Sequence, residues 1–231
     1  MEVPMADRVV APAARVALVA GATGLVGREV LAALLTDRRY CAVHCVGRRP
    51  APIQHAKLTN HVADLGTLTT LPGISHVDDV FIALGTTIKT AGSQAAFRAV
   101  DLDAVVAVAR AARDIGATRL GVVSAMGADA NSLVFYNRVK GEMEDAVAKL
   151  GYSSLVVARP SMLDGKRSEL AQAARPAEKL GLLAMALLKP LIPADYRAIA
   201  AAQVARALVS GVKRSASGVH VLRSAELQSV R

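Results

Sequence analysis

The chain has 231 residues, a length typical of one α/β domain, and its hydrophobic fraction of 53% is ample for a layered core. No run reaches the roughly 18 consecutive apolar residues that span a bilayer, so we expect no integral membrane segment. The formal net charge is +9, but the basic residues form no run and aromatic residues make up only 3% of the chain, so we expect no nucleic-acid partner.

The first 15 residues precede the first apolar run. They include Arg8 and Arg15 and lack the apolar stretch of a secretory signal peptide. We therefore interpret them as a lead-in to the first strand and expect a cytoplasmic protein.

Short apolar runs alternate with longer helical patterns, which is typical of βαβ units that build a parallel sheet. Strands are expected at 15–20, 42–46, 60–63, 80–84, 119–123, 154–158 and 219–222. Helices are expected at 25–35, 92–115, 132–150, 177–188 and 200–212. This order predicts an α/β fold in one domain over 1–231. Its doubly wound parallel sheet is a Rossmann fold of strand order 3-2-1-4-5-6, with a possible seventh strand.

Residues with known end preferences mark two of these helices. Gly116 is expected to end the helix at 92–115. Asn131 or Ser132 is expected to cap the helix at 132–150, and Gly151 to end it.

Cys41 and Cys45 lie four residues apart in an expected strand, so their side chains should face the same side of the sheet. Two cysteines form no disulfide framework, and free cysteine is among the most buried residue types, so we expect buried, reduced thiols. The five histidines are scattered without ligand spacing, and we expect no metal site.

The segment GATGLVG directly follows the first expected strand and opens a helix. In a dinucleotide-binding loop Gly21 permits the sharp turn, Gly24 lets backbone N–H groups approach a pyrophosphate, and Gly27 allows close helix packing. The phosphates would lie at the positive end of the helix. An ordinary glycine-rich turn is the alternative. The expected cofactor contacts in this loop are Gly21, Thr23, Gly24, Leu25, Val26 and Gly27.

The second strand ends in Gly47-Arg48-Arg49, where an NAD site usually places an acidic residue for the ribose hydroxyls. Two guanidinium groups suit a 2′-phosphate, which needs charge and forked donors. We therefore expect NADP(H) in preference to NAD(H). The alternative is two solvated arginines in a loop.

Two further segments are candidates for cofactor contact. Asp64 follows the third strand and is placed to accept a hydrogen bond from the adenine amino group, although an exposed loop aspartate is an equal alternative. Leu84, Gly85 and Thr86 follow the fourth strand at its carboxyl end, where cofactors lie in such sheets.

Tyr136 and Lys140 are four residues apart on one helix face, and Ser124 ends the fifth strand. A phenol can exchange a proton with a reacting oxygen if its pKa is lowered from about 10, and the Lys140 ammonium is expected to lower it. Ser124 would polarise the substrate carbonyl. The alternative is a surface Tyr–Lys pair on a scaffold without chemistry.

The segments GATGLVG, GRR, ALGTT, VSAMGAD, VFYNRVKGEME and ARPSML resemble the atypical short-chain dehydrogenases of the Tat-interacting-protein oxidoreductase group. The resemblance runs from Val16 to beyond Ala205. It implies a Rossmann fold, NADP(H) and a Ser–Tyr–Lys site. These properties carry over to Gly21, Gly24, Gly27, Arg48, Arg49, Ser124, Tyr136 and Lys140. By the same resemblance, the backbone at Pro160 contacts the nicotinamide carboxamide.

The chain departs from the family pattern at two places. Ala125 replaces a serine that is often found beside the catalytic serine. Better-known short-chain dehydrogenases use an Asn in the long middle helix to hold a water, whereas the matching stretch here reads Val100-Asp101-Leu102-Asp103. A four-residue proton relay is therefore not expected.

Residues 161–195 are expected to form the substrate side of the site. Their apolar stretch Leu180–Ile192 fits four roles: a cover for a hydrophobic substrate, a partner interface, a membrane-surface contact or an ordinary core helix. The helix at 92–115 and the helix that carries Tyr136 could pair in a homodimer.

The leading hypothesis is an NADP(H)-dependent oxidoreductase that acts on a small-molecule carbonyl or alcohol substrate. The first alternative is a non-catalytic NADP(H)-binding regulatory protein on the same scaffold. An epimerase or isomerase that uses the cofactor transiently is a third, and it would show no net consumption of NADPH.

Overall fold

The computed structural model describes residues 14–164, 194–214 and 216–229. Its main sheet has the strand order β3-β2-β1-β4-β5-β6-β9, and every neighbouring pair is parallel. The strands are β1 (Arg15–Ala20), β2 (Tyr40–Gly47), β3 (Leu58–Val62), β4 (Asp79–Ile82), β5 (Arg119–Val123), β6 (Ser154–Arg159) and β9 (Gly218–Arg223). A short second sheet pairs β7 (Leu163–Asp164) with β8 (Ile199–Ala200). The expected doubly wound sheet, including its seventh strand, is confirmed.

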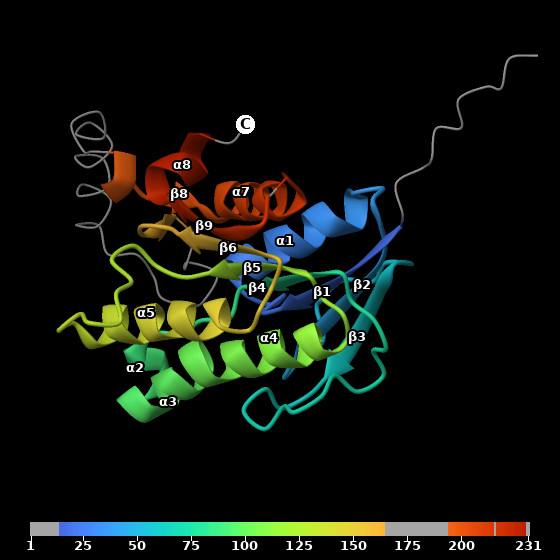
Figure 1. The fold of residues 1–231 in the computed structure, drawn as a ribbon, viewed down its shortest axis with the longest axis horizontal. Coiled ribbons are helices and arrows are strands. Elements are labelled where there is room, and N and C mark those ends of the chain that lie inside the picture. The colour runs from blue at the N-terminus through green and yellow to red at the C-terminus, as the bar shows by residue number, and fades with distance from the viewer. Residues whose placement is uncertain (1–13, 165–193, 215, 230–231) are drawn as a thin grey trace, which may run out of the picture.

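Helices cover both faces of this sheet (Figure 1). On one face lie α1 (Leu25–Thr36) and α7 (Ala201–Arg214), and on the other α4 (Ala104–Asp114) and α5 (Phe135–Ala148). The remaining short elements are α2 (Ile88–Ala91), α3 (Gln94–Arg98), η1 (Ala99–Asp103), η4 (Ala194–Tyr196) and α8 (Ser224–Ser229). The helix expected at 177–188 and the apolar stretch Leu180–Ile192 lie outside the described residues.

The central strands are buried on both faces, which explains why their sequences are apolar almost throughout. Successive side chains point to opposite faces, so Val80 and Ile82 of β4 pack under α4 while Phe81 packs under α1 and α7. All three side chains are fully buried. The two hydrophobic layers hold the carboxyl ends of the strands in line along one edge.

The long helix expected at 92–115 is broken into several pieces. Gly92 adopts a positive φ of 87° and ends α2, and Ser93 then caps α3 by accepting a hydrogen bond from the Ala96 N–H. The segment Ala99–Asp103 is π-helical, and only from Ala104 does the chain form a regular α-helix. The alanine- and valine-rich pattern continues across these breaks, and for that reason it predicted one helix.

The helix expected at 132–150 begins three residues later, at Phe135. Its N-cap, Val134, has no side-chain hydrogen bond, and the Ser132 hydroxyl instead accepts a bond from the Val134 N–H before the helix starts. The prediction of an Asn131 or Ser132 cap is therefore wrong.

The two thiols differ in exposure. Cys45 is buried, which raises its pKa to about 12, whereas Cys41 is exposed. The pairing of β1 with β2 shifts register between Arg15 and Val16, whose partners are Tyr40 and Ala42, so Cys41 lies in an irregularity at the start of its strand. The expectation of two buried thiols is correct for Cys45 alone.

Asp79 is fully buried at the amino edge of the sheet and joins four strands. Arg15 of β1 and Arg119 of β5 each donate two hydrogen bonds to its carboxylate, at 2.6–3.0 Å, and the Tyr40 hydroxyl of β2 donates a fifth at 2.7 Å. Burial acts to raise the pKa of Asp79, but the bonds from Arg119, Arg15 and Tyr40 outweigh it and lower the pKa. The carboxylate is therefore charged and fully paired.

We expect Asp79→Asn to lower the free energy of unfolding by about 2–4 kcal/mol, because it leaves two partly buried guanidinium groups without their buried counter-charge. Urea unfolding measures the change, and Asp145→Asn, at an exposed position of α5, is the control. Because the folded pKa of Asp79 is lowered, its contribution is present above the ordinary carboxyl pKa and is lost as pH falls through the folded value. Equal unfolding midpoints for the two variants would contradict this role.

Candidate active site

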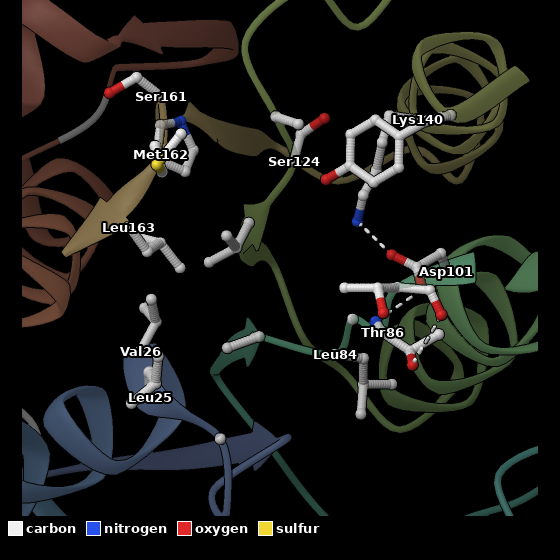
Figure 2. A pocket seen from close by; sticks show the side chains of 18 residues that line it. Leu25, Val26, Leu84, Thr86, Asp101, Ser124, Lys140, Ser161, Met162 and Leu163 are labelled. Atoms are coloured by element: carbon white, nitrogen blue, oxygen red, sulfur yellow. Dashed lines mark hydrogen bonds and ion pairs between the residues drawn. The ribbon is translucent and has the colours of Figure 1, made fainter. Parts of the chain in front are cut away.

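A cavity of about 690 Å³ opens at the carboxyl edge of the sheet, beyond the ends of β1, β4, β5 and β6. Leu25 and Val26 face it from α1, and Lys140 and Asp101 face it from the opposite side (Figure 2). A smaller cavity of about 80 Å³ lies between the glycine loop and the end of β2, and Leu84 lines both. The two spaces are therefore neighbours on one edge.

Most of the site residues expected from the sequence line these cavities. The larger cavity is lined by Gly24, Leu25, Val26, Leu84, Gly85, Thr86, Ser124, Tyr136, Lys140 and Pro160. The smaller is lined by Gly21, Thr23, Arg48, Arg49 and Leu84. Gly27 and Asp64 line neither.

The glycine loop is shaped by two close backbone approaches. Gly21 has a φ of 89°, and a Cβ there would lie 2.5 Å from the Ala83 carbonyl oxygen at the end of β4. A Cβ on Gly27 would lie 2.0 Å from the Gly21 carbonyl oxygen. Gly27 thus packs under the loop itself, and its lack of a side chain lets α1 begin directly behind the turn.

The first turn of α1 is open to an anion. Gly24 is its N-cap and has no side chain that could bond the first N–H groups, which have no partner within the helix. Gly24, Leu25 and Val26 line the larger cavity at this end. A helix N-terminus of this kind favours a phosphate group through its N–H donors and its dipole.

Arg48 and Arg49 are exposed in the loop after β2 and line the smaller cavity with Gly21 and Thr23. Their positive charges fit a phosphate on the adenosine side of a dinucleotide. Asp64 is exposed and outside this cavity, where its Oδ1 accepts a hydrogen bond from the Gly66 N–H at 3.0 Å. Its neighbour Leu65 is the residue of that loop that lines the cavity.

Ser124, Tyr136 and Lys140 meet in the wall of the larger cavity. Ser124 directly follows β5, and the other two lie one turn apart on α5. The Tyr136 ring packs against the buried ring of Phe97, with 5.4 Å between centroids. Packing from α3 therefore restricts the phenol.

The electrostatic setting of Tyr136 differs from the expected one. Burial raises the pKa of its phenol above the usual value, and the negative charge of Asp101 raises it further. The expected lowering by Lys140 is wrong for this arrangement, because the lysine Nζ lies 2.7 Å from Asp101 Oδ1 and its charge is balanced there. The phenol therefore keeps its proton at neutral pH.

Asp101 is the ionisable cavity residue that the sequence interpretation did not assign to the site. It was noted only as the place where a known Asn is lacking, yet its carboxylate is 1% exposed and lines the cavity. A charged residue between Val100 and Leu102, in a segment expected to pack on the sheet, was the available signal. The π-helical turn that contains Asp101 has no recognised sequence pattern that would predict it.

Two buried side-chain oxygens in the described part of the chain lack an aligned hydrogen bond: Ser124 Oγ and Asp101 Oδ1. The latter has its ion pair with Lys140, whereas Ser124 Oγ has no such contact. Buried hydroxyl groups are normally bonded. The Ser124 hydroxyl is therefore available to a polar group in the cavity, which the start of α1 also lines.

The wall beyond β6 is formed by Pro160, Ser161, Met162 and Leu163. The Pro160 carbonyl accepts a hydrogen bond from the Met126 N–H at 2.9 Å, which links this segment to the loop after β5. Met162 is 74% exposed at the rim. Most of the substrate side expected at 161–195, namely residues 165–193, lies outside the described part of the chain.

Residues 21–214 match a protein-family model described as NAD(P)H-binding. Fungal relatives carry the name Protein fmp52, mitochondrial. The protein of Emericella nidulans is 36% identical over 178 residues, covering 71% of this chain and 72% of its own. That of Coccidioides immitis is 32% identical over 205 residues, covering 83% of each.

Solved structures share the fold at low identity. A short-chain dehydrogenase from Burkholderia cenocepacia, in complex with NADP, has a TM-score of 0.65 at 15% identity, covering 94% of this chain and 91% of its own. A UDP-N-acetylglucosamine 4-epimerase from Methanobrevibacter ruminantium, in complex with UDP-N-acetylmuramic acid, has a TM-score of 0.66 at 15% identity, covering 91% and 77%. Both likenesses concern the fold.

The cytoplasmic location expected from the sequence is contradicted, because the fungal relatives are named as mitochondrial proteins. Mitochondrial targeting segments are amphipathic and rich in arginine. The lack of an apolar run at 1–15 is therefore evidence against a secretory signal peptide alone and gives no information on mitochondrial targeting. Among the described residues, no helix is long and apolar enough to cross a membrane.

We expect Gly27→Ala to lower the free energy of unfolding by about 1–3 kcal/mol, because its new methyl group must displace the Gly21 carbonyl. Thermal or urea unfolding measures this change. Gly66→Ala is the matched control, since its Cβ would meet Asp64 Oδ1 at an ordinary 3.5 Å. If the two variants unfold alike, the close packing at Gly27 has no energetic role.

Proposed function

Because the chain belongs to the NAD(P)H-binding family, we propose that it is an NADP(H)-dependent oxidoreductase of the short-chain dehydrogenase/reductase type. Its substrate is a small carbonyl or alcohol. The observation that carries the proposal is the meeting of Ser124, Tyr136 and Lys140 in one cavity with the open first turn of α1. The expected phosphate site and the expected proton-transfer group therefore line the same cavity.

The pyrophosphate would be held by the N–H groups at Gly24, Leu25 and Val26, where the cavity meets the helix N-terminus. The adenosine side would lie in the smaller cavity. There, Arg48 and Arg49 support a 2′-phosphate and hence NADP(H) in preference to NAD(H). The absence of an acidic residue at this position of the sequence supports the same preference.

A bound reduced dinucleotide supplies the hydride that the carbonyl carbon accepts. The chain supplies the proton, because the Tyr136 hydroxyl lines the same cavity and keeps its proton at neutral pH. Among the described residues Ser124 Oγ has no hydrogen-bond partner, and it would donate a hydrogen bond to the substrate oxygen, which stabilises the negative charge that develops there. Lys140 would hold the nicotinamide ribose.

The cavity wall matches a modestly polar substrate. Its one described ion pair, Lys140 with Asp101, is internally balanced, and its far side carries Val123, Met162 and Leu163. The names of the fungal relatives support a mitochondrial setting for this activity.

We expect Tyr136→Phe to reduce turnover of carbonyl substrates at least 10²-fold while the NADPH dissociation constant stays within about 3-fold, because the phenyl ring keeps the packing but has no proton to donate. A carbonyl panel followed by NADPH absorbance and a fluorescence titration of NADPH measure the two effects. Tyr196→Phe, at an exposed position that does not line the cavity, is the control. Full activity in Tyr136→Phe would refute the catalytic assignment. NADPH binding without turnover by the native protein would instead favour a regulatory role.

We expect Arg48→Gln/Arg49→Gln to raise the dissociation constant of NADPH about 10- to 100-fold and to leave that of NADH nearly unchanged, since only the former carries the 2′-phosphate. Calorimetry with both dinucleotides measures the preference. Arg110→Gln, at an exposed position of α4, is the matched control. Equal losses for NADPH and NADH would show that the two arginines do not read the 2′-phosphate.

A further inference from the structure

Asp101 lies in a local break of helical structure that faces the cavity. It belongs to η1, the π-helical segment Ala99–Asp103, which joins α3 to α4 and packs against α5. π-helical turns are rare and occur frequently at functional sites. The break turns a carboxylate into the wall of the cavity, where it is 1% exposed, while Asp103 of the same segment stays at the surface.

The carboxylate of Asp101 connects three elements of the site. Its Oδ1 lies 2.7 Å from the Nζ of Lys140 on α5, and its Oδ2 accepts a hydrogen bond of 2.9 Å from the Thr86 N–H in the loop after β4 (Figure 2). Lys140 is itself 3% exposed. A buried ammonium without a counter-charge is strongly unfavourable, so Asp101 determines where the lysine rests.

On the basis of the proposed function, we propose that Asp101 is a positioning residue that holds Lys140 at the cavity wall and, by balancing its charge beside Tyr136, biases the site toward carbonyl reduction. The short-chain dehydrogenase pattern places an Asn that binds a water in this stretch. A carboxylate at the position instead changes the charge that the phenol experiences. It thereby acts on the reaction through Lys140 and Tyr136.

The bias follows from the proton balance of the reaction. In reduction, the carbonyl carbon receives a hydride from the reduced dinucleotide and the oxygen receives a proton from Tyr136, and the phenolate then regains a proton from water. Oxidation of an alcohol needs the phenolate first. Burial and the Asp101 charge both raise the pKa of Tyr136, which extends the protonated phenol that reduction requires to higher pH and makes the phenolate that oxidation requires scarcer.

Other charged groups on the elements around Tyr136 are engaged elsewhere. Arg98 of α3 pairs with Glu142 of α5, and Arg159 of β6 pairs with Glu144 of α5. On α5, Arg138 donates a hydrogen bond to the Ser132 carbonyl. On the neighbouring short helix α2, Lys89 is exposed. The charge that acts on the phenol from within the cavity wall is therefore that of the Lys140–Asp101 pair.

The test is a pH titration of the protein without cofactor, followed by the ultraviolet absorbance of tyrosinate, with the Tyr136→Phe difference spectrum assigning the signal. We expect Asp101→Asn to lower the midpoint of Tyr136 by about one pH unit, because it removes the negative charge that raises the pKa of the phenol. The alkaline limit of NADPH-dependent reduction should move to lower pH by the same amount. The matched control is Asp103→Asn, the same substitution at a surface position of η1, which should change neither value.

Two more variants keep the test decisive if Asp101→Asn does not fold. Lys140→Gln leaves the Asp101 carboxylate without its counter-charge and should raise the titration midpoint of Tyr136. The double variant Asp101→Asn/Lys140→Gln removes both charges, so its Tyr136 midpoint should lie below that of Lys140→Gln. A merely structural role of Asp101 predicts no such ordering. Identical midpoints in these variants, or in folded Asp101→Asn and Asp103→Asn, would overturn the inference.

Failure of this inference is distinct from failure of the proposed function. The tyrosinate titration needs no turnover. A native protein that reduces carbonyls with NADPH, but whose titration and pH profile are unmoved by Asp101→Asn, refutes the role of Asp101 alone. A native protein that reduces no carbonyl refutes the proposed function, and with it the bias toward reduction.

Discussion

Asp79 ties together the strands on which the rest of the molecule depends. Two arginines and a tyrosine from β1, β5 and β2 converge on this one buried carboxylate of β4, at the amino edge of the sheet. Every bond that it accepts constrains how far a neighbouring strand can slide. Because the strands are parallel, a register set at the amino edge also sets the alignment of the carboxyl ends, where the cavities lie.

At the carboxyl edge of the sheet, the two sides of the cavity differ: one is shaped by close packing and the other carries the charged groups. The side formed by α1 combines close backbone packing at Gly21 and Gly27 with the apolar side chains of Leu25 and Val26. The side formed by η1 and α5 carries the ionisable groups, Asp101, Tyr136 and Lys140. Under the proposed function, the first side would hold phosphate groups and the second would transfer a proton, and both line one cavity.

The break in the helix expected at 92–115 determines the charged side of the cavity. The pattern of alanine and valine predicted a regular α-helix over 92–115, in which Asp101 and Asp103, two residues apart, would also point to nearly opposite sides. The π-helical turn buries the first and leaves the second exposed. The buried carboxylate then holds both a lysine of the next crossover helix and the backbone of Thr86, so a local irregularity organises the reactive side of the site.

The sequence by itself determined the strand order, the position of the glycine loop and the set of polar residues at the strand ends. Each of these depends on short-range patterns: alternating apolar runs, glycines next to a strand, and side chains that follow it. The tertiary structure alone decided the breaks in the long helix, the exposure of Cys41 and the charge around Tyr136. Lys140 was expected to lower the pKa of the phenol, but its ammonium pairs with Asp101, 39 positions earlier in the chain. Electrostatic effects depend on distances between residues that are remote in sequence, and only the folded chain brings those residues together.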